Sequence, residues 1–440
     1  MKFLSFRGGI HPPHHKKFTE KLSVENAVEP KRVVIPMQQH IGAPCDPLVK
    51  VGDKVFVGQK IGEAKGFVSA PVHSSVSGEV KQIAIMPTAG GEGQCIVIES
   101  DGLNVLHESV IPKGEINNLT GKEILAIIKE AGIVGLGGAT FPTHVKLSPP
   151  PEKKIDTIIL NGAECEPFLT ADHRLMLESP EKIIYGLKAM MKVVDVETAY
   201  IGIENNKPDA IEVMKNAAKN ESNIHVVGLV TKYPQGAEKQ LINACTSREV
   251  PSGGLPMDAG VIVNNVATAA AISDAIQLGM PLIQRIATIT GKGVKTPKNL
   301  LIKVGTSVKE IIEQCGGYNT NPGKIILGGP MMGLAQYTDE LPATKGTSGI
   351  LILTQEDARL PEPDPCIRCG KCIEVCPINL QPLFLSAFSL QNMHETTEKY
   401  NALDCIECGS CSYICPSKRP LLQSIRVSKR EIIAKKRKTK

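Results

Sequence analysis

The chain is organised around a cysteine repeat that reads Cys366-Ile-Arg-Cys369-Gly-Lys-Cys372-Ile-Glu-Val-Cys376-Pro377 and then Cys405-Ile-Glu-Cys408-Gly-Ser-Cys411-Ser-Tyr-Ile-Cys415-Pro416. Each half has the spacing C-x2-C-x2-C-x3-C-P, which is typical of bacterial proteins that hold two 4Fe–4S clusters. In such proteins the last cysteine of each half usually ligates the cluster of the other half. We therefore predict one cluster on Cys366, Cys369, Cys372 and Cys415, and a second on Cys405, Cys408, Cys411 and Cys376.

Two other uses of these cysteines fit the pattern poorly. A structural zinc ion needs only four ligands in two C-x2-C pairs and has no use for eight cysteines at this repeat. Structural disulfides require an oxidising compartment, and nothing in the sequence suggests one. The repeat is the strongest functional signal in the chain.

The length and composition are those of a soluble protein with several domains. A chain of 440 residues exceeds what one hydrophobic core usually serves, so we expect two to four domains. The content of 42% hydrophobic and 22% charged residues is ordinary. No apolar run of about 18 residues predicts a membrane-spanning helix, and the N-terminus lacks the apolar stretch of a secretory signal. We expect a protein that is cytoplasmic or faces the cytoplasm.

The net charge of +5 is concentrated at the C-terminus. Such a basic tail is most often a solvated, disordered end, although it could contact anionic lipid headgroups or an acidic partner. Nucleic acid is not an expected partner, because no basic face studded with aromatic residues accompanies the tail. The basic residues of the tail are Lys435, Lys436, Arg437, Lys438 and Lys440.

Five further cysteines lie outside the repeat. Single cysteines usually behave as small buried hydrophobes, and we interpret Cys45, Cys95, Cys245 and Cys315 in this way. Cys165 is left open because it lies inside a polar motif described below.

The first third of the chain predicts an arm and a small β domain. Residues 1–30 are rich in His, Lys and Pro, and the trio His11, His14 and His15 lacks metal-ligand spacing, so we expect an arm that packs on another domain. Residues 31–105 contain short β-runs with turn signals about every ten residues. They look like a barrel-sandwich module of the biotinyl or lipoyl type. Lys65 lies in the wrong context for a carrier lysine, so we expect it to be unmodified.

The remaining chain predicts α/β, α+β and cluster units. Residues 115–280 alternate helices and short apolar strands, which predicts a largely parallel, Rossmann-like sheet. Residues 283–355 form a small α+β unit. The proline-rich segment 360–365 predicts a stiff linker into a cluster domain at 360–420, and 421–440 is the basic tail. The fold class is therefore multidomain α/β and α+β.

A second group of candidate site residues lies in residues 115–280. Gly132–Pro142 is rich in glycine, which lets backbone N–H groups approach a phosphate or a planar ring. On its own this segment could equally be a simple helix-to-strand connection. However, Asn161–Pro167 and Asn264–Thr268 each follow a predicted strand, and ligands of open α/β sheets bind at the carboxyl ends of strands.

Together these segments resemble the flavin- and NADH-binding subunit of respiratory complex I. That family has a glycine-rich loop ending in Phe-Pro, then Asn-x-Asp-Glu-x-Glu-Pro, then Asn-Asn-Val-x-Thr, and this chain has Gly135–Pro142, Asn161–Pro167 and Asn264–Thr268 in the same order. It departs at Ala163, where complex I has an aspartate, and at Leu136, where complex I has an arginine.

The order of modules resembles the C subunit of the Rnf complex over nearly the whole chain. The shared modules are Gly8–Pro13, a barrel-sandwich, a flavin-type domain, a β-grasp module and the eight-cysteine region. The amphipathic run Leu380–Leu390 looks like part of an α-helical ferredoxin type of cluster domain. The resemblance implies a peripheral subunit on the cytoplasmic face of the cell membrane. It would exchange electrons between NAD(H) and other subunits, indirectly with ferredoxin, in a complex that translocates Na⁺ or H⁺.

The resemblance also implies site residues. FMN would be held by the glycine loop, Lys146 and polar strand-end residues. Phe141 could stack on nicotinamide or adenine, and it could equally be a core aromatic. Glu166 could meet the nicotinamide ribose or amide. The implied cofactor-binding residues are Gly135, Gly137, Gly138, Phe141, Lys146, Asn161, Glu164, Glu166, Asn264, Asn265 and Thr268.

These parts belong together for a chemical reason. Nicotinamide passes two electrons as a hydride, whereas an iron–sulfur cluster accepts one at a time, so a flavin must stand between them. The implied order is NADH, flavin, cluster, cluster, next subunit, or the reverse, with no general acid, nucleophile or catalytic metal required from the protein. The alternative is a non-catalytic electron-transfer or scaffold subunit with a degenerate flavin site, which Ala163 and Leu136 favour and the retained glycines oppose.

Overall fold

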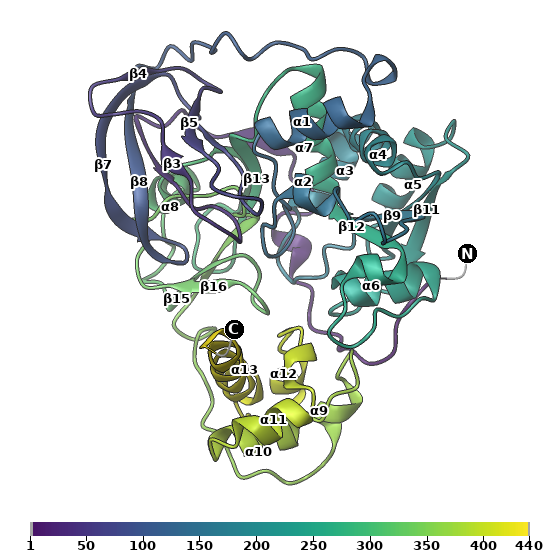
Figure 1. The fold of residues 1–440 in the computed structure, drawn as a ribbon. Coiled ribbons are helices and arrows are strands. Elements are labelled where there is room, and N and C mark those ends of the chain that lie inside the picture. Colours follow the sequence, from purple (N-terminus) through teal and green to yellow (C-terminus); the bar gives the residue numbers. More distant parts are fainter. Residues whose placement is uncertain (1–2, 439–440) are drawn as a thin grey trace.

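The computed structural model describes residues 3–438. Figure 1 shows a β-sandwich and a mixed-sheet domain on one side, an α/β domain beside them, and a helical cysteine-rich domain at one end of the molecule. Among residues 3–438, no helix is both long and apolar enough to cross a membrane.

The β-sandwich has two small sheets that enclose their own core. The sheets have the strand orders β2-β8-β7-β4 and β3-β5-β6, and Val33, Ile35, Ile61 and Ile96 are fully buried between them. The strands are β2 (Arg32–Pro36), β3 (Asp46–Pro47), β4 (Lys54–Val55), β5 (Lys60–Glu63), β6 (Val72–His73), β7 (Gly78–Thr88) and β8 (Gly91–Ser100).

The α/β domain is a parallel sheet covered on both faces, as predicted. Its strand order is β11-β10-β9-β12. Ile158 and Leu160 join the core beneath α4 and α7, whereas Ile159 between them joins the core beneath α6. The elements are α1 (Gly121–Glu130), α2 (Thr143–Lys146), β9 (Thr157–Asn161), α3 (Ala171–Glu178), α4 (Pro180–Val194), β10 (Thr198–Glu204), α5 (Pro208–Ala217), β11 (Ile224–Leu229), α6 (Glu238–Thr246), β12 (Val261–Asn265) and α7 (Val266–Gln277).

The mixed-sheet domain takes one strand from the N-terminal arm. Its order is β1-β14-β13-β17-β15-β16, with β13 and β17 parallel at the centre, and helix α8 adds Ile311 and Ile312 to its core. The elements are β1 (Val24–Asn26), β13 (Gln284–Thr290), β14 (Lys298–Lys303), α8 (Val308–Gln314), β15 (Lys324–Leu327), β16 (Leu334–Gln336) and β17 (Gly349–Leu353).

The cysteine-rich domain consists of helices joined by loops, with no strand among its described residues. Its helices are α9 (Lys371–Glu374), α10 (Pro382–Leu390), α11 (His394–Lys399), α12 (Ser410–Ile414) and α13 (Leu421–Lys438). The expectation of a disordered basic tail is wrong for residues 421–438. Ile425 and Ile432 of α13 are buried in the domain core, and Lys435 and Lys436 pair with Glu395 and Glu398 of α11, each at 2.6 Å. Lys440 lies outside the described residues.

Candidate functional site

The polar strand ends meet where the order of the parallel strands reverses. The chain passes from β9 to β10 and β11 on one side and returns with β12 on the other side of β9. Asn161 ends β9 and lies opposite Asn265, which ends β12. The crevice at such a reversal is where open α/β sheets bind their ligands.

The glycine loop covers this crevice. The loop closes on itself through a 2.8 Å hydrogen bond from the Gly135 N–H to the Phe141 carbonyl, and the Leu136 N–H donates to Thr268 Oγ1 at 3.0 Å. A Cβ on Gly137 would lie 2.9 Å from Asn265 Nδ2, so only glycine allows this approach. Gly138 has φ +98° and no neighbour within 4 Å of a built Cβ, so its outer side is open.

Several hydrogen-bond donors in and beside the loop have no acceptor within the described residues. A bound ligand with several acceptor atoms would pair with them. Among residues 3–438, the N–H groups of Gly137, Gly138 and Ala139 donate to no protein acceptor. Asn264 Nδ2 and the Nε and Nη1 atoms of Arg285 are buried without a partner, while Arg285 Nη2 donates to the Leu136 carbonyl. The three loop N–H groups are exposed and open to water or a ligand, whereas the Asn264 and Arg285 atoms are buried, and an unpaired buried donor costs about 1–3 kcal/mol. A phosphate or a flavin ring carbonyl has acceptors that suit these donors.

The turn after β9 is built around Glu164. Its carboxylate accepts the N–H groups of Asp172 at 2.7 Å and His173 at 3.3 Å, which caps the first turn of α3. Burial, together with the nearby Glu164 carboxylate, raises the pKa of Asp172. Asp172 Oδ2 in turn accepts from Asn265 Nδ2 at 2.6 Å, so Glu164 and Asn265 belong to one network at the crevice.

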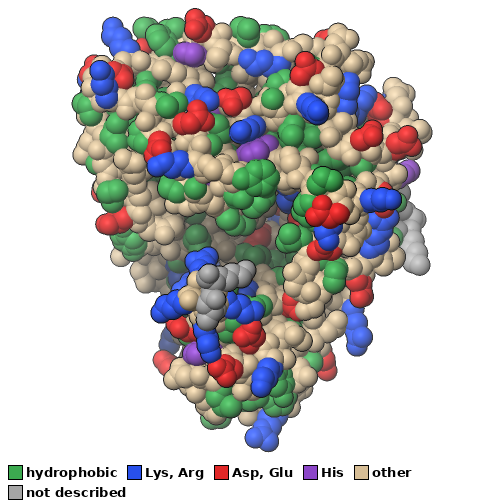
Figure 2. Space-filling view, viewed as in Figure 1, with side chains coloured by type: hydrophobic (Ala, Val, Ile, Leu, Met, Phe, Trp, Pro, Cys, Tyr) green, Lys and Arg blue, Asp and Glu red, His purple; other side chains and the backbone are tan. Residues whose placement is uncertain are grey.

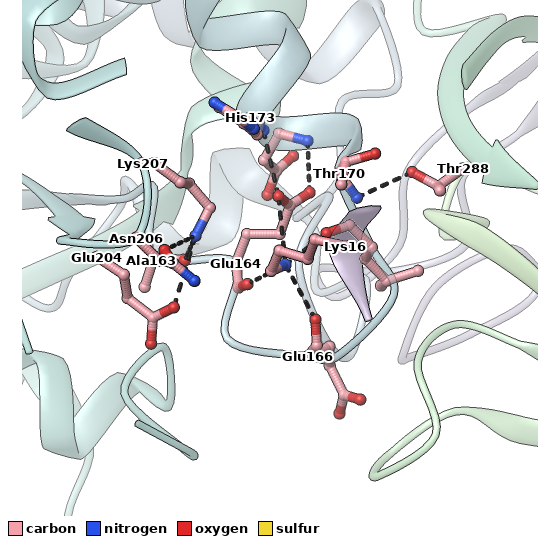
Figure 3. Close-up of polar contacts among 12 residues, drawn as sticks. Lys16, Ala163, Glu164, Glu166, Thr170, His173, Glu204, Asn206, Lys207 and Thr288 are labelled. Carbon is pink, nitrogen blue, oxygen red and sulfur yellow. Dashed lines mark hydrogen bonds and ion pairs between the residues drawn. The ribbon is translucent and has the colours of Figure 1, made fainter. Parts of the chain in front are cut away.

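A lysine from the N-terminal arm enters this turn, as Figure 3 shows. Lys16 is buried, and its Nζ donates to the carbonyls of Glu164 at 2.8 Å, Glu166 at 3.1 Å and Leu169 at 2.5 Å. The Glu164 carboxylate lies 3.7 Å away. Burial lowers the pKa of Lys16. Nothing in the composition of the arm distinguished this lysine from its neighbour Lys17.

Position 163 has a structural role in this chain. Ala163 is fully buried, and its carbonyl accepts from Lys207 Nζ at 2.7 Å. Lys207 also lies 3.5 Å from the Glu204 carboxylate, and both side chains are 1% exposed. Lys207 follows the end of β10, and this strand-end position was the only sequence signal that could have pointed to it.

The Glu166 side chain contacts another domain. Its two carboxylate oxygens accept the N–H groups of Met331 and Met332 in the mixed-sheet domain, each at 3.0 Å. Burial raises the pKa of Glu166 to about 7, although these two N–H groups act in the opposite direction. A nicotinamide contact by Glu166 stays a prediction.

The remaining predicted residues lie around the same strand ends. Lys146 Nζ donates to Glu238 Oε1 and to the Val263 carbonyl, both at 2.8 Å. Asn161 Nδ2 donates to the Gly236 carbonyl at 2.8 Å. Phe141 is partly buried. On the face in Figure 2, the surface is hollowed between the upper part of the molecule and the cysteine-rich end.

The cysteines gather in two sets of four around separate cavities. Both cavities are partly open to solvent. Within residues 3–438, no group of three or more His, Cys, Asp or Glu side chains has the geometry of a site for a single metal ion. One cavity is lined by Cys366, Cys369, Cys372 and Cys415, and the other by Cys376, Cys405, Cys408 and Cys411.

The two halves of the repeat have the same local backbone. Arg368 and Glu407 have φ of 56° and 58°, and Gly370 and Gly409 have φ of 78° and 80°. Left-handed residues in such turns direct successive N–H groups into a concavity that favours anions, which suits a ring of thiolates. Burial raises the pKa of Cys405 to about 11 and of Cys411 to about 12, so metal binding there must displace protons.

The set of Cys376, Cys405, Cys408 and Cys411 adjoins the α/β domain. Tyr233 Oη donates to the Cys408 carbonyl at 2.9 Å, and Gln240 Nε2 donates to the Pro377 carbonyl at 3.1 Å. Cys165, whose role the sequence left open, packs in the apolar cluster that contains Tyr233 and Cys408. The other set is more exposed, since Cys366 and Cys369 are at the surface.

A buried lysine joins three domains at the start of the glycine loop. Lys345 Nζ donates to the carbonyls of Pro71 at 2.8 Å and Gly132 at 2.6 Å. Burial lowers the pKa of Lys345 to about 7. A neutral amine still has two N–H groups for these two carbonyls.

This lysine makes stability depend on pH. Because the pKa of Lys345 in the folded protein lies below the usual lysine value of 10.5, the unfolded chain binds more protons between about pH 7 and about pH 10. We expect its contribution to the free energy of unfolding to rise with pH across this range and to be flat below it. Lys345→Met should reduce the rise in melting temperature with pH across this range, as measured by calorimetry. A rise equal to that of the wild type would contradict the lowered pKa of Lys345.

Comparison with known families gives a match in each domain. A family model described as the RnfC barrel sandwich hybrid domain matches residues 4–103, and the Nuo51 FMN-binding domain matches residues 128–274. An SLBB domain matches residues 286–335, and a 4Fe-4S dicluster domain matches residues 359–416.

Curated relatives match along the whole chain. The C subunit of the Na(+)-translocating ferredoxin:NAD(+) oxidoreductase complex of Acetobacterium woodii is 55% identical, covering 100% of this chain and 99% of the relative. The C subunit of the proton-translocating ferredoxin:NAD(+) oxidoreductase complex of Clostridium ljungdahlii is 54% identical, covering 97% and 94%. The C subunit of the ion-translocating oxidoreductase complex of Rhodobacter capsulatus is 43% identical, covering 98% and 83%.

Among solved structures, the NAD⁺-reducing NiFe hydrogenase in its H₂-reduced state matches with a TM-score of 0.49 and 17% identity. The match covers 73% of this chain and 63% of the hydrogenase chain. A likeness of this degree is too weak to support a functional conclusion.

Proposed function

This chain belongs to the family of C subunits of ion-translocating ferredoxin:NAD(+) oxidoreductase complexes, and from that premise we propose that it carries electrons between NAD(H) and the other subunits. It holds FMN and two 4Fe–4S clusters, as its domain families indicate. The translocated ion is Na⁺ or H⁺, since relatives of 55% and 54% identity are named for different ions. The observation that carries the proposal is the combination of exposed N–H groups in the glycine loop with the buried, unpaired side-chain donors of Asn264 and Arg285.

We place FMN at the reversal between β9 and β12. The unpaired N–H groups of Gly137 and Gly138 and the amide of Asn264 are positioned to donate to it. Around them, Thr268 and Asn265 position the loop, and Glu164 holds α3 in place. The other proposed residues are Gly135, Phe141, Lys146, Asn161 and Glu166.

The departures from complex I do not damage this site. Leu136 contributes backbone atoms, and the buried guanidinium of Arg285 lies at its carbonyl, so a positive charge is present although the loop lacks its arginine. Ala163 contributes a carbonyl to Lys207. These contacts favour a working flavin site over the degenerate alternative.

When bound, FMN converts the two-electron chemistry of nicotinamide into the one-electron chemistry of the clusters. The chain's own task is to position these groups and to tune them. The Leu380 N–H donates to Cys376 Sγ at 3.2 Å, and hydrogen bonds to cluster sulfurs raise reduction potentials. The set of Cys376, Cys405, Cys408 and Cys411 adjoins the α/β domain. Exposure of Cys366 and Cys369 supports the other set as the one that exchanges electrons with a partner subunit.

The finer fold assignments and the location are also proposals. The order β14-β13-β17-β15 with parallel central strands supports a β-grasp assignment for residues 283–355, and the helices of the cysteine-rich domain support an α-helical ferredoxin type. The protein lies on the cytoplasmic face of the cell membrane, bound through other subunits.

We expect high salt or mild alkali to release the protein from isolated membranes, because partner contacts and ionic contacts would hold it there. Immunoblots of the supernatant and pellet provide the measurement. Retention in the pellet after removal of every other subunit would contradict peripheral attachment.

We expect Gly138→Val to abolish FMN binding and NADH-dependent dye reduction while iron content is kept. The valine would fill the open side of the loop where the ligand must lie. Gly52→Val is the matched control, since Gly52 has φ +92° and also no neighbour within 4 Å. Flavin and iron are measured after anaerobic purification. Normal flavin content in Gly138→Val would place the site elsewhere, and a purified wild-type protein that takes up no FMN would favour the scaffold alternative.

We expect wild-type protein to contain about eight iron atoms, and replacement of Cys376 and Cys372 to damage different clusters. Cys376→Ser should weaken the electron paramagnetic resonance signal of the set with Cys405, Cys408 and Cys411, because the structure places Cys376 at that cavity. Cys372→Ser should weaken the other signal. Loss of the same signal in both variants would show that each cluster is bound within one motif.

A further inference from the structure

The segment Gly8–Lys16 of the N-terminal arm contacts both the proposed flavin site and the adjoining cysteine set. Figure 1 shows the arm, in purple, running between the α/β domain and the cysteine-rich domain before it reaches the centre of the molecule. This segment, called the strap below, contains the motif Gly8-Gly-Ile-His-Pro-Pro13, to which neither cofactor gives a role.

One end of the strap is fixed in the turn of the proposed flavin site. Lys16 donates to three carbonyls of residues 164–169 (Figure 3). The Phe168 N–H donates to the His14 carbonyl at 2.8 Å, and the His15 ring stacks on Phe168 with ring centres 4.6 Å apart. A fully buried ammonium group with several acceptors is held in one geometry, since leaving it unpaired would be costly.

The other end of the strap lies against the loop that carries Cys376. The Gly9 N–H donates to the Val375 carbonyl at 2.9 Å. A Cβ on Gly8 would lie 2.9 Å from the Cys376 carbonyl oxygen, and a Cβ on Gly9 would lie 2.7 Å from the Tyr233 carbonyl oxygen. Their φ values are +83° and +82°, so both the conformation and the close approach require glycine.

The middle of the strap pairs with the residue that joins the two domains. Ile10 and Tyr233 exchange two backbone hydrogen bonds of 2.8 Å. The hydroxyl of the same tyrosine donates to the Cys408 carbonyl at 2.9 Å. The strap therefore contacts the backbones around two cysteines of one set, directly at Cys376 and through Tyr233 at Cys408.

We propose that the strap is a positioning element that sets the spacing between the flavin site and the cluster of Cys376, Cys405, Cys408 and Cys411. Gly8 and Gly9 are its positioning residues at the cluster end, and Lys16 is its anchor at the flavin end. The inference rests on the proposed function. It adds that electron transfer between the two sites depends on a segment that is remote from the cluster domain in sequence.

The first test uses hydrogen exchange and needs no electron transfer. Gly8→Ala and Gly9→Ala should push the strap away from the cysteine loop. Amide exchange in residues 373–376 should then be faster, because the loop loses the contacts of the strap with the Val375 and Cys376 carbonyls and opens more often. Gly66→Ala is the matched control, since Gly66 also has φ +82° but no neighbour within 4 Å. Exchange at residues 373–376 that equals wild type in both variants would overturn the proposal.

The second test separates the two sites kinetically in the full-length, cofactor-loaded protein. After rapid mixing with NADH, flavin bleaching should keep its wild-type rate. The reduced-cluster resonance signal in freeze-quenched samples should appear several-fold more slowly, because the distance that the electron must cross has increased. Gly66→Ala should show neither change.

The remaining outcomes also decide the question. Equal slowing of flavin bleaching and cluster reduction would show a general structural role and overturn the proposal, as would iron loss in both glycine variants. If only Gly8→Ala loses iron, the exchange and kinetic results for Gly9→Ala decide the question. The added Cβ of that variant meets Tyr233, Lys232 and Phe6 and no cysteine ligand. Failure of wild-type flavin to react with NADH would refute the proposed function, and the exchange test of the strap would still stand.

Discussion

The reversal of strand order between β9 and β12 is the constraint on which the site depends. Because the two strands are parallel neighbours, Asn161 and Asn265 end at the same edge of the sheet. The next residues must diverge, and Asn265 caps α7 by accepting the Ala267 N–H at 2.7 Å. The glycine loop then fits over the N-terminus of that helix, where N–H groups and the helix dipole favour an anionic group. The fold thus creates the binding crevice before any ligand-specific residue contributes.

Local signals in the sequence predicted local structure well. The Thr120–Glu123 capping box opens α1 as expected, because both of its hydrogen bonds form within four residues. The strands and the cysteine sets also followed from short patterns. The prediction of a disordered tail was wrong because a run of like charges gives no information about Glu395 and Glu398, which lie about 40 residues away in sequence. Lys16, Arg285 and Lys345 were missed for the same reason.

The buried cations that the sequence did not reveal share one physical feature. Each donates to backbone carbonyls of a different segment: Lys16 to the turn after β9, Lys207 to Ala163, and Lys345 to Gly132. A carbonyl acceptor is available wherever the chain turns, so such a contact leaves no trace in residue identity. Burial of an ammonium group is costly, and its acceptors must therefore be in place when the domains dock. These lysines make the domain arrangement depend on a few specific contacts.

In the cysteine-rich domain, each motif contributes its last cysteine to the set of the other motif. The fold of this domain therefore also depends on contacts between distant segments. Cys376 lies with the second motif and Cys415 with the first, so neither set is complete until both motifs have folded together. The 28 residues between Cys376 and Cys405 contain α10 and α11, which pack on α13. The C-terminal helix is therefore needed to bring the motifs together, and its hydrophobic positions Ile425 and Ile432 explain why this basic segment is ordered. Shared ligands turn two short motifs into a single cooperative domain.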